Sequence, residues 1–128
     1  MIVDTSAVVA ILEGEANSEE LATAIMNARY VGIGAPNAVE AGLVLTARFK
    51  RNATGVLLRF FGESRIQVVP FTNLHWQRAL DAFERFGKGR HPAGLNFGDC
   101  MTYATASLAR QPLLCRGDDF RKTDIPLV

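Results

Sequence analysis

The chain has 128 residues and a mass of 14.0 kDa, with 48% hydrophobic residues, 21% charged residues and a formal net charge of +1. This length predicts a single domain over residues 1–128, and the composition is typical of a globular protein with a packed core. The sequence contains no apolar run that is long enough to span a membrane. It also does not begin with the basic residues and the apolar segment of a signal peptide, so we expect a cytoplasmic protein without membrane association. Zinc-binding, serine-hydrolase, dinucleotide-binding and P-loop motifs are absent.

Strand-like and helix-like patterns alternate along the chain. Short apolar runs predict strands, and apolar residues at helical spacing behind capping residues predict helices. In chain order the sequence predicts a strand over 1–3, a helix over 7–12, a helix over 18–28, a strand over 30–33, helices over 36–51 and 53–62, a strand over 66–69, a helix over 73–87, a loop over 88–97, a helix over 98–109, a strand over 112–115 and a possible fifth strand over 125–128.

This alternation predicts an α/β fold with three layers, in which helices cover both faces of a mostly parallel sheet. In the helix over 73–87 we expect the core-facing residues to be Leu74, Ala79, Leu80, Phe83 and Phe86. The order of the strands is not readable from the sequence. Binding sites in such folds lie outside the carboxyl ends of the strands.

Charge is unevenly distributed along the chain. Residues 1–40 hold six acids and one base, a local charge of −5, whereas residues 41–98 hold nine bases and three acids, a local charge of +6. The basic middle section is suited to a polyanion such as a nucleic acid, although solvated helix faces alone would also account for it.

Four acidic residues lie in unusual surroundings. Asp4 directly follows an apolar strand, Glu40 lies in the least polar part of its helix, Asp99 lies in the first turn of a helix, and Asp118 follows the fourth strand. Each has an ordinary structural explanation as a cap, an ion-pair partner or a turn residue. If they converge at one sheet edge, however, their mutual repulsion favours a hard divalent cation, Mg²⁺ or Mn²⁺.

At these acids the sequence resembles a known family. The segments Ile2-Val3-Asp4-Thr5-Ser6-Ala7, Val39-Glu40-Ala41, Leu95-Asn96-Phe97-Gly98-Asp99-Cys100 with Tyr103-Ala104, and Gly117-Asp118-Asp119-Phe120 resemble the PIN-domain family, and within it the VapC-type toxins of toxin–antitoxin pairs. The match spans nearly the whole chain, and its block from Leu95 to Ala104 is the most specific part.

The resemblance implies a Mg²⁺-dependent endoribonuclease on a three-layer α/β/α sandwich, with Mn²⁺ as a possible substitute, inhibited by a VapB-like antitoxin. It implies that Asp4 and Asp99 bind the metal and that Glu40 and Asp118 complete the catalytic acids. It also implies that the hydroxyl of Ser6 or Thr5 holds Asp4 or a metal-bound water. The neighbouring Asp119 leaves the position of the fourth acid open by one residue.

Partner surfaces are also expected. Candidate contacts to RNA phosphates are Arg48, Lys50, Arg51, Lys88, Arg90 and His91, and the loop over 88–94 is expected to lie near the acids because it leads into Asp99. Residues 43–61 are expected to form an apolar groove for an antitoxin helix. The family implies a homodimer or a larger toxin–antitoxin hetero-oligomer.

Other functions remain open at this point. A flap-type nuclease acting on DNA uses a similar acidic pocket but needs a longer chain. A catalytically weak module that binds an antitoxin or a nucleic acid fits the same residues. A phosphorylated receiver domain is disfavoured, because the third predicted strand ends in Val68-Val69-Pro70 and not in an aspartate.

Overall fold

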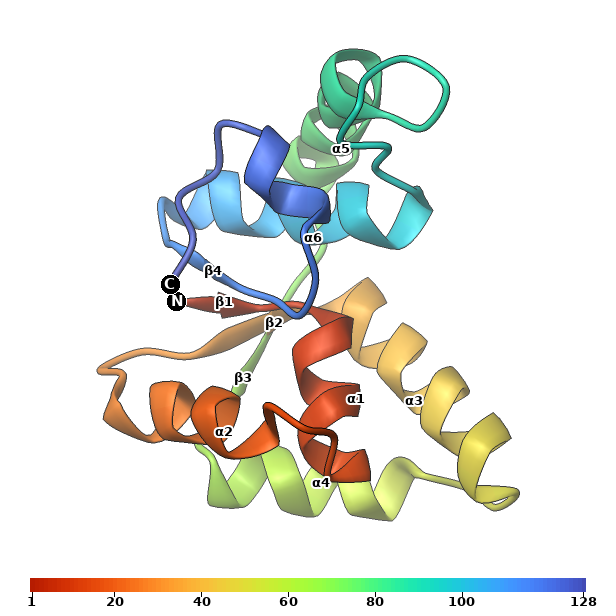
Figure 1. The fold of residues 1–128 in the computed structure, drawn as a ribbon, viewed down its shortest axis with the longest axis vertical. Helices are drawn as coiled ribbons and strands as arrows, with labels where there is room; N and C mark the ends of the chain where they lie inside the picture. The colour runs from red at the N-terminus through yellow and green to blue at the C-terminus, as the bar shows by residue number, and fades with distance from the viewer.

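The computed structural model describes all residues from 1 to 128 and has a central, entirely parallel sheet (Figure 1). Its four strands run in the order β3-β2-β1-β4. They are β1 (Ile2–Val3), β2 (Gly32–Gly34), β3 (Gln67–Val69) and β4 (Leu113–Leu114). The predicted α/β fold with a parallel sheet is therefore confirmed.

Six α-helices and one short 3-10 helix connect and follow these strands. They are α1 (Thr5–Glu13), α2 (Ser18–Asn27), α3 (Ala35–Phe49), α4 (Thr54–Glu63), α5 (Asn73–Phe86), α6 (Phe97–Ala109) and η1 (Asp119–Lys122). Each predicted helix is present within a few residues of its expected bounds. None of the helices combines the length and the apolar composition needed to span a lipid bilayer.

The predicted fifth strand does not form. Leu127 makes only an isolated parallel bridge to Leu113 at the edge of the sheet. Pro126, which precedes it, accepts a hydrogen bond from the Leu113 amide but has no N–H to donate, so the ladder cannot extend.

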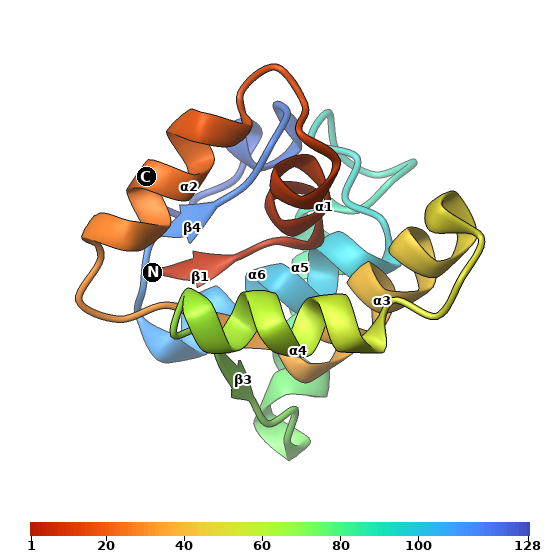
Figure 2. The same cartoon turned by 90° about the horizontal axis from the view of Figure 1, so that it is seen from below.

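Helices cover both faces of the sheet, as Figures 1 and 2 show. The helices α5 and α6 lie on one face, and α1, α2 and α4 lie on the other. The strand residues alternate between two cores: Val3 and Leu114 pack into the core under α1 and α4, whereas Ile2 and Leu113 pack into the core under α6. This alternation follows from the period of two in a strand.

One edge of the sheet brings the starts of three helices together. The helices α1 and α3 begin directly after β1 and β2, and α6 begins at the same edge (Figure 1). The connections from β1 to β2 and from β2 to β3 cross one face of the sheet, whereas the connection from β3 to β4 crosses the opposite face. The direction of the chain across the sheet therefore reverses between the neighbouring strands β1 and β4. This is where parallel α/β folds form their binding crevice.

The buried face of α5 differs in part from the prediction. Leu74 is 64% exposed and Leu80 is 58% exposed, whereas Phe83 and Phe86 are half-buried against the core under α6. Ala79 is buried as expected, and Ala82 is buried beside it. Their small side chains let α5 pack closely on α6, and this packing leaves Leu74 and Leu80 outside the interface.

Candidate active site

An acidic cavity of about 260 Å³ lies at the carboxyl edge of the sheet. Four carboxylates line it, from the end of β1, from α3, from the start of α6 and from the turn after β4. They belong to Asp4, Glu40, Asp99 and Asp119. Residues far apart in the sequence thus meet at the edge predicted for Asp4, Glu40 and Asp99.

Asp4 is held by two hydrogen bonds as the chain passes from β1 into α1. It is the N-cap of α1, and its Oδ2 accepts a hydrogen bond of 2.9 Å from the Ser6 amide. The hydroxyl of Thr102, a fully buried residue of α6, donates to Asp4 Oδ1 over 2.6 Å. Asp4 itself is only 5% exposed, so these donors stabilise a carboxylate that burial would otherwise disfavour.

Glu40 approaches the cavity from α3 and lies against the start of α6. Thr5 Oγ1 donates to Glu40 Oε2 over 2.6 Å and not to Asp4, which is contacted by the Ser6 amide and not by a hydroxyl of either residue. A Cβ atom at Gly98 would lie 2.5 Å from Glu40 Oε1, so the close approach of this carboxylate to α6 depends on a glycine at position 98. No protein group donates a hydrogen bond to Glu40 Oε1.

Asp99 is fixed by a reciprocal cap at the start of α6. Its Oδ2 accepts from the Asn96 amide, and the Asn96 side chain accepts from the Asp99 amide, both over 2.9 Å. Burial, followed by the charges of Asp4, Asp119 and Glu40, raises the pKa of the Asp99 carboxyl from 3.8 to about 6, and the hydrogen bond from Asn96 opposes this shift. The acids therefore act on one another electrostatically.

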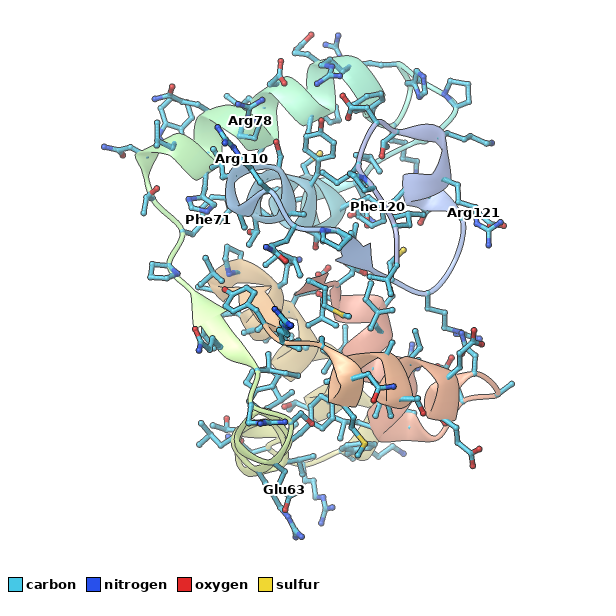
Figure 3. The ribbon with its side chains drawn as sticks, turned by 90° about the vertical axis from the view of Figure 1, so that its left-hand side faces the viewer. Glu63, Phe71, Arg78, Arg110, Phe120 and Arg121 are labelled. Atoms are coloured by element: carbon cyan, nitrogen blue, oxygen red, sulfur yellow. The ribbon has the colours of Figure 1, made fainter.

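The fourth acid of the cavity is Asp119 and not Asp118. Asp118 does not line the cavity, its side chain is 81% exposed, and it forms an ion pair with Arg121 over 2.9 Å. Buried Phe120 lies on the interior side of η1, whereas Arg121 points outward (Figure 3). The anchoring of Phe120 thus fixes the turn in which Asp119, and not Asp118, lines the cavity.

The donor set of the cavity fits a hard divalent cation. All four acids offer carboxylate oxygens, neither histidine nor cysteine lines the cavity, and oxygen ligands suit Mg²⁺ and Mn²⁺. No three acidic, histidine or cysteine side chains are already gathered around one point at metal-binding distances. Burial and, to a smaller extent, the neighbouring acids raise the pKa of Asp99, and a bound cation would favour its ionised form.

Most of the basic residues expected to contact RNA lie away from the cavity. Only Arg48 lines it, and Lys50 and Arg51 are exposed just beyond α3. In the loop over 88–94, Arg90 pairs with Glu84 over 2.9 Å, the ring of His91 accepts a hydrogen bond from the Ala93 amide, and Lys88 is exposed. This loop contributes no residue to the cavity, contrary to the expectation from its sequence position.

Two buried polar residues were missed by the sequence analysis. Thr102 holds Asp4, and Asn37 Nδ2 donates to the Gly98 carbonyl over 3.1 Å, which ties α3 to the start of α6. A threonine or asparagine inside a helix carries no distinctive sequence signal. The position of Thr102, one helical turn after Asp99, was the only available indication.

The expected groove over residues 43–61 is only partly visible. Phe49, Phe60 and Phe61 pack against the core under α1 and α4, whereas Leu43 and Leu58 are exposed on α3 and α4. The aromatic residues of this segment thus contribute to the core, and the exposed leucines are what it offers to a partner.

Comparisons with known proteins identify the family. The family model described as PIN domain matches residues 1–126. Ribonuclease VapC36 of Mycobacterium tuberculosis is 49% identical over 126 residues, which cover 98% of this chain and 91% of that protein.

Two solved structures share the fold. The structure titled as M. tuberculosis VapC20, a Sarcin-Ricin loop cleaving toxin, has a TM-score of 0.79 and 16% identity, covering 99% of this chain and 97% of its own. A toxin–antitoxin complex from Klebsiella pneumoniae has a TM-score of 0.73 and 16% identity, covering 99% and 95%. From the family match and the identity to VapC36, the chain belongs to the PIN-domain family and, within it, to the VapC ribonucleases.

Proposed function

We propose that this protein is the toxin of a toxin–antitoxin pair and acts as a Mg²⁺-dependent endoribonuclease, for which Mn²⁺ can substitute. The observation that carries the proposal is the convergence of Asp4, Glu40, Asp99 and Asp119 on one cavity, together with the raised pKa of Asp99. The relatedness to proteins named VapC ribonucleases supports the choice of RNA as the substrate.

Asp4 and Asp99 are the proposed metal ligands. Asp99 Oδ2 accepts the hydrogen bond of the helix cap, whereas no protein group donates to Asp99 Oδ1, which leaves Oδ1 available to a metal. Asp4 is held from both sides, by Ser6 and Thr102, and this fixes the direction of its remaining lone pairs. When bound, Mg²⁺ lowers the pKa of water and neutralises negative charge that develops on a phosphate.

Glu40 and Asp119 are the proposed groups that orient and deprotonate the attacking water. Glu40 is suited to this role because Thr5 fixes Oε2 while Oε1 stays available to accept a proton. The water oxygen then bonds to phosphorus, one phosphorus–oxygen bond of the RNA backbone breaks, and the leaving oxygen takes up a proton. Asp118, exposed and paired with Arg121, is not needed for this chemistry.

Two protein partners complete the proposal. We place the antitoxin helix on the exposed leucines of α3 and α4, with a basic antitoxin side chain in the acidic cavity. A second copy of this chain is proposed to cover an apolar face built by α3, α5 and α6, called here the α3–α5–α6 face. Its exposed members are Val39, Trp76, Leu80 and Phe97.

The α3–α5–α6 face is continuous because two neighbouring hollows on it share Phe97 and Met101. One hollow is lined only by hydrophobic residues, and Phe97 is 80% exposed. Exposed apolar patches of this kind are typical of protein–protein interfaces. The other hollow is lined in part by Glu40, so a second copy here would lie next to the active site.

The activity is tested by incubating the purified, antitoxin-free protein with total cellular RNA in Mg²⁺, in Mn²⁺ and in EDTA, and mapping the ends by sequencing. The proposal predicts discrete cuts that need the metal, disappear in Asp99→Asn and persist in Asp118→Asn. Equal cutting in EDTA, or by Asp99→Asn, would contradict it. A folded wild-type protein that cuts no RNA would favour a binding module, and cutting of branched DNA alone would favour a flap-type nuclease.

A further inference from the structure

Two arginines line the otherwise acidic cavity. Arg48 lies two helical turns after Glu40 on α3, with Val44 between them, so all three residues face the cavity from one side of the helix. Arg116 comes from the turn after β4, and its amide donates to Ser6 Oγ over 2.9 Å. This hydrogen bond ties Arg116 to the segment that carries Asp4.

Both guanidinium groups are held by acids from the end of α1. Arg116 pairs closely with Glu15, and Arg48 pairs closely with Glu13 and lies 3.7 Å from Glu15. Glu15 thus bridges the two arginines. The left-handed turn at Gly14, with φ of +65°, ends α1 between the two acids.

A contribution to the stability of the fold does not explain the placement of these ion pairs. The carboxyl-terminal end of a helix disfavours negative charge, yet Glu13 is the last residue of α1 and Glu15 follows it closely. The arginine side chains remain 52% and 47% exposed, so they are accessible from solvent and their pairing with glutamate is readily exchanged.

The negative charge of the cavity indicates that these arginines contact the RNA. An RNA strand that enters is an anion approaching four carboxylates, and Arg48 and Arg116 are the cationic side chains that line its path. Guanidinium groups bind phosphate oxygens in a two-pronged geometry, which makes arginine well suited to this contact.

We infer that Arg48 and Arg116 bind the RNA phosphates on either side of the cleaved one, and that Glu15 holds both guanidinium groups until the RNA displaces it. The inference rests on the proposed function and adds Arg116 and Glu15 to its binding machinery. The negative charge of Glu15 is therefore expected to weaken RNA binding. If Glu15 only stabilised the fold, its charge would not lower the affinity for RNA.

The test is equilibrium binding of a short fluorescein-labelled oligouridylate to protein carrying Asp99→Asn, in EDTA, across a series of KCl concentrations. Phosphate contacts are independent of base sequence, so this RNA is a sufficient probe. Adding Arg116→Ala is expected to weaken binding about fivefold and to lower the slope of log affinity against log salt by about 0.7. Glu15→Gln is expected to tighten binding about threefold, because it removes a competing anion.

Arg59→Ala is the matched control. Arg59 also pairs with a glutamate, Glu63, over 2.8 Å, but it lies on α4 and not in the cavity. Its removal changes the net charge equally, and both affinity and slope should stay close to those of the parent. Arg116→Lys should retain the salt slope while it loses part of the affinity.

The possible outcomes separate the inference from the proposed function. Binding that is equally unaffected by Arg116→Ala and Arg59→Ala would overturn the inference and leave the acidic site intact. A parent protein that binds no RNA even at low salt would overturn both. If Arg116→Ala abolishes binding of oligoglutamate but not of RNA, the arginines dock an acidic protein segment and the inference is wrong.

Discussion

Replacing Asp99 by asparagine should stabilise the metal-free protein near neutral pH. The pKa of this carboxyl is raised from 3.8 to about 6, so the folded protein binds more protons than the unfolded chain between about pH 4 and pH 6. The stability of the wild type therefore falls as the pH rises through this range. At about 1.4 kcal/mol for each tenfold change, ionised Asp99 costs the fold at most about 3 kcal/mol above pH 6.

Asparagine removes this cost and keeps the local structure. Its side-chain oxygen can still accept the hydrogen bond from the Asn96 amide that closes the cap of α6. Urea unfolding in EDTA should therefore show equal stability of the two proteins near pH 4 and a gain of about 1–3 kcal/mol for Asp99→Asn above pH 7.

The control is Asp118→Asn, which makes the same change of charge at an exposed position outside the cavity. It should alter the stability by less than about 0.5 kcal/mol at either pH. Adding Mg²⁺ should stabilise the wild type more than Asp99→Asn, because only the wild type keeps both proposed ligands. Equal or lower stability of Asp99→Asn at neutral pH would refute the argument that burial and the neighbouring acids disfavour the ionised form of Asp99.

Three further results are expected. Asp119→Asn should lower the RNA cleavage rate about a hundredfold and Asp118→Asn less than about twofold, because only Asp119 lines the cavity; the reverse order would contradict the proposed roles. Thr102→Val should weaken Mn²⁺ binding about 10- to 100-fold, because it removes the hydroxyl that holds Asp4, and Thr102→Ser should restore it; unchanged titrations would exclude this role. Leu80→Glu should shift the protein to a monomer in light scattering without lowering its melting temperature, and an unchanged mass would argue against a dimer through the α3–α5–α6 face.

The order of the helices and strands and three of the acids that line the cavity could be predicted from the sequence. Strand–helix alternation fixes a parallel sheet, and Asp4 has to lie at its carboxyl edge because β1 ends at Val3. The sequence predicted only part of the buried face of α5: Ala79 is buried as expected, but Leu74 and Leu80 are exposed. Leu74 and Leu80 show the same apolar spacing as core residues, and an exposed interface helix cannot be told from a core helix by that spacing alone.

The finer details of the site depend on tertiary contacts. Asp118 and Asp119 are adjacent and chemically identical, and only the anchoring of Phe120 in the core determines which of the two faces the cavity. The pairing of Arg116 with Glu15 joins the turn after β4 to the end of α1, and no local pattern encodes such a contact. Likewise, proximity in sequence to Asp99 did not bring the loop over 88–94 to the cavity.

We propose that these carboxylates hold a metal ion that is required for RNA cleavage. The most direct measurement is to titrate Mn²⁺ into the antitoxin-free protein, follow bound metal by electron paramagnetic resonance, and measure RNA cleavage in the same samples. We expect cleavage to rise in proportion to bound Mn²⁺, and we expect Asp4→Asn and Asp99→Asn to lose metal binding and cleavage together. Cleavage that does not depend on bound Mn²⁺, or full metal binding by both variants, would contradict it.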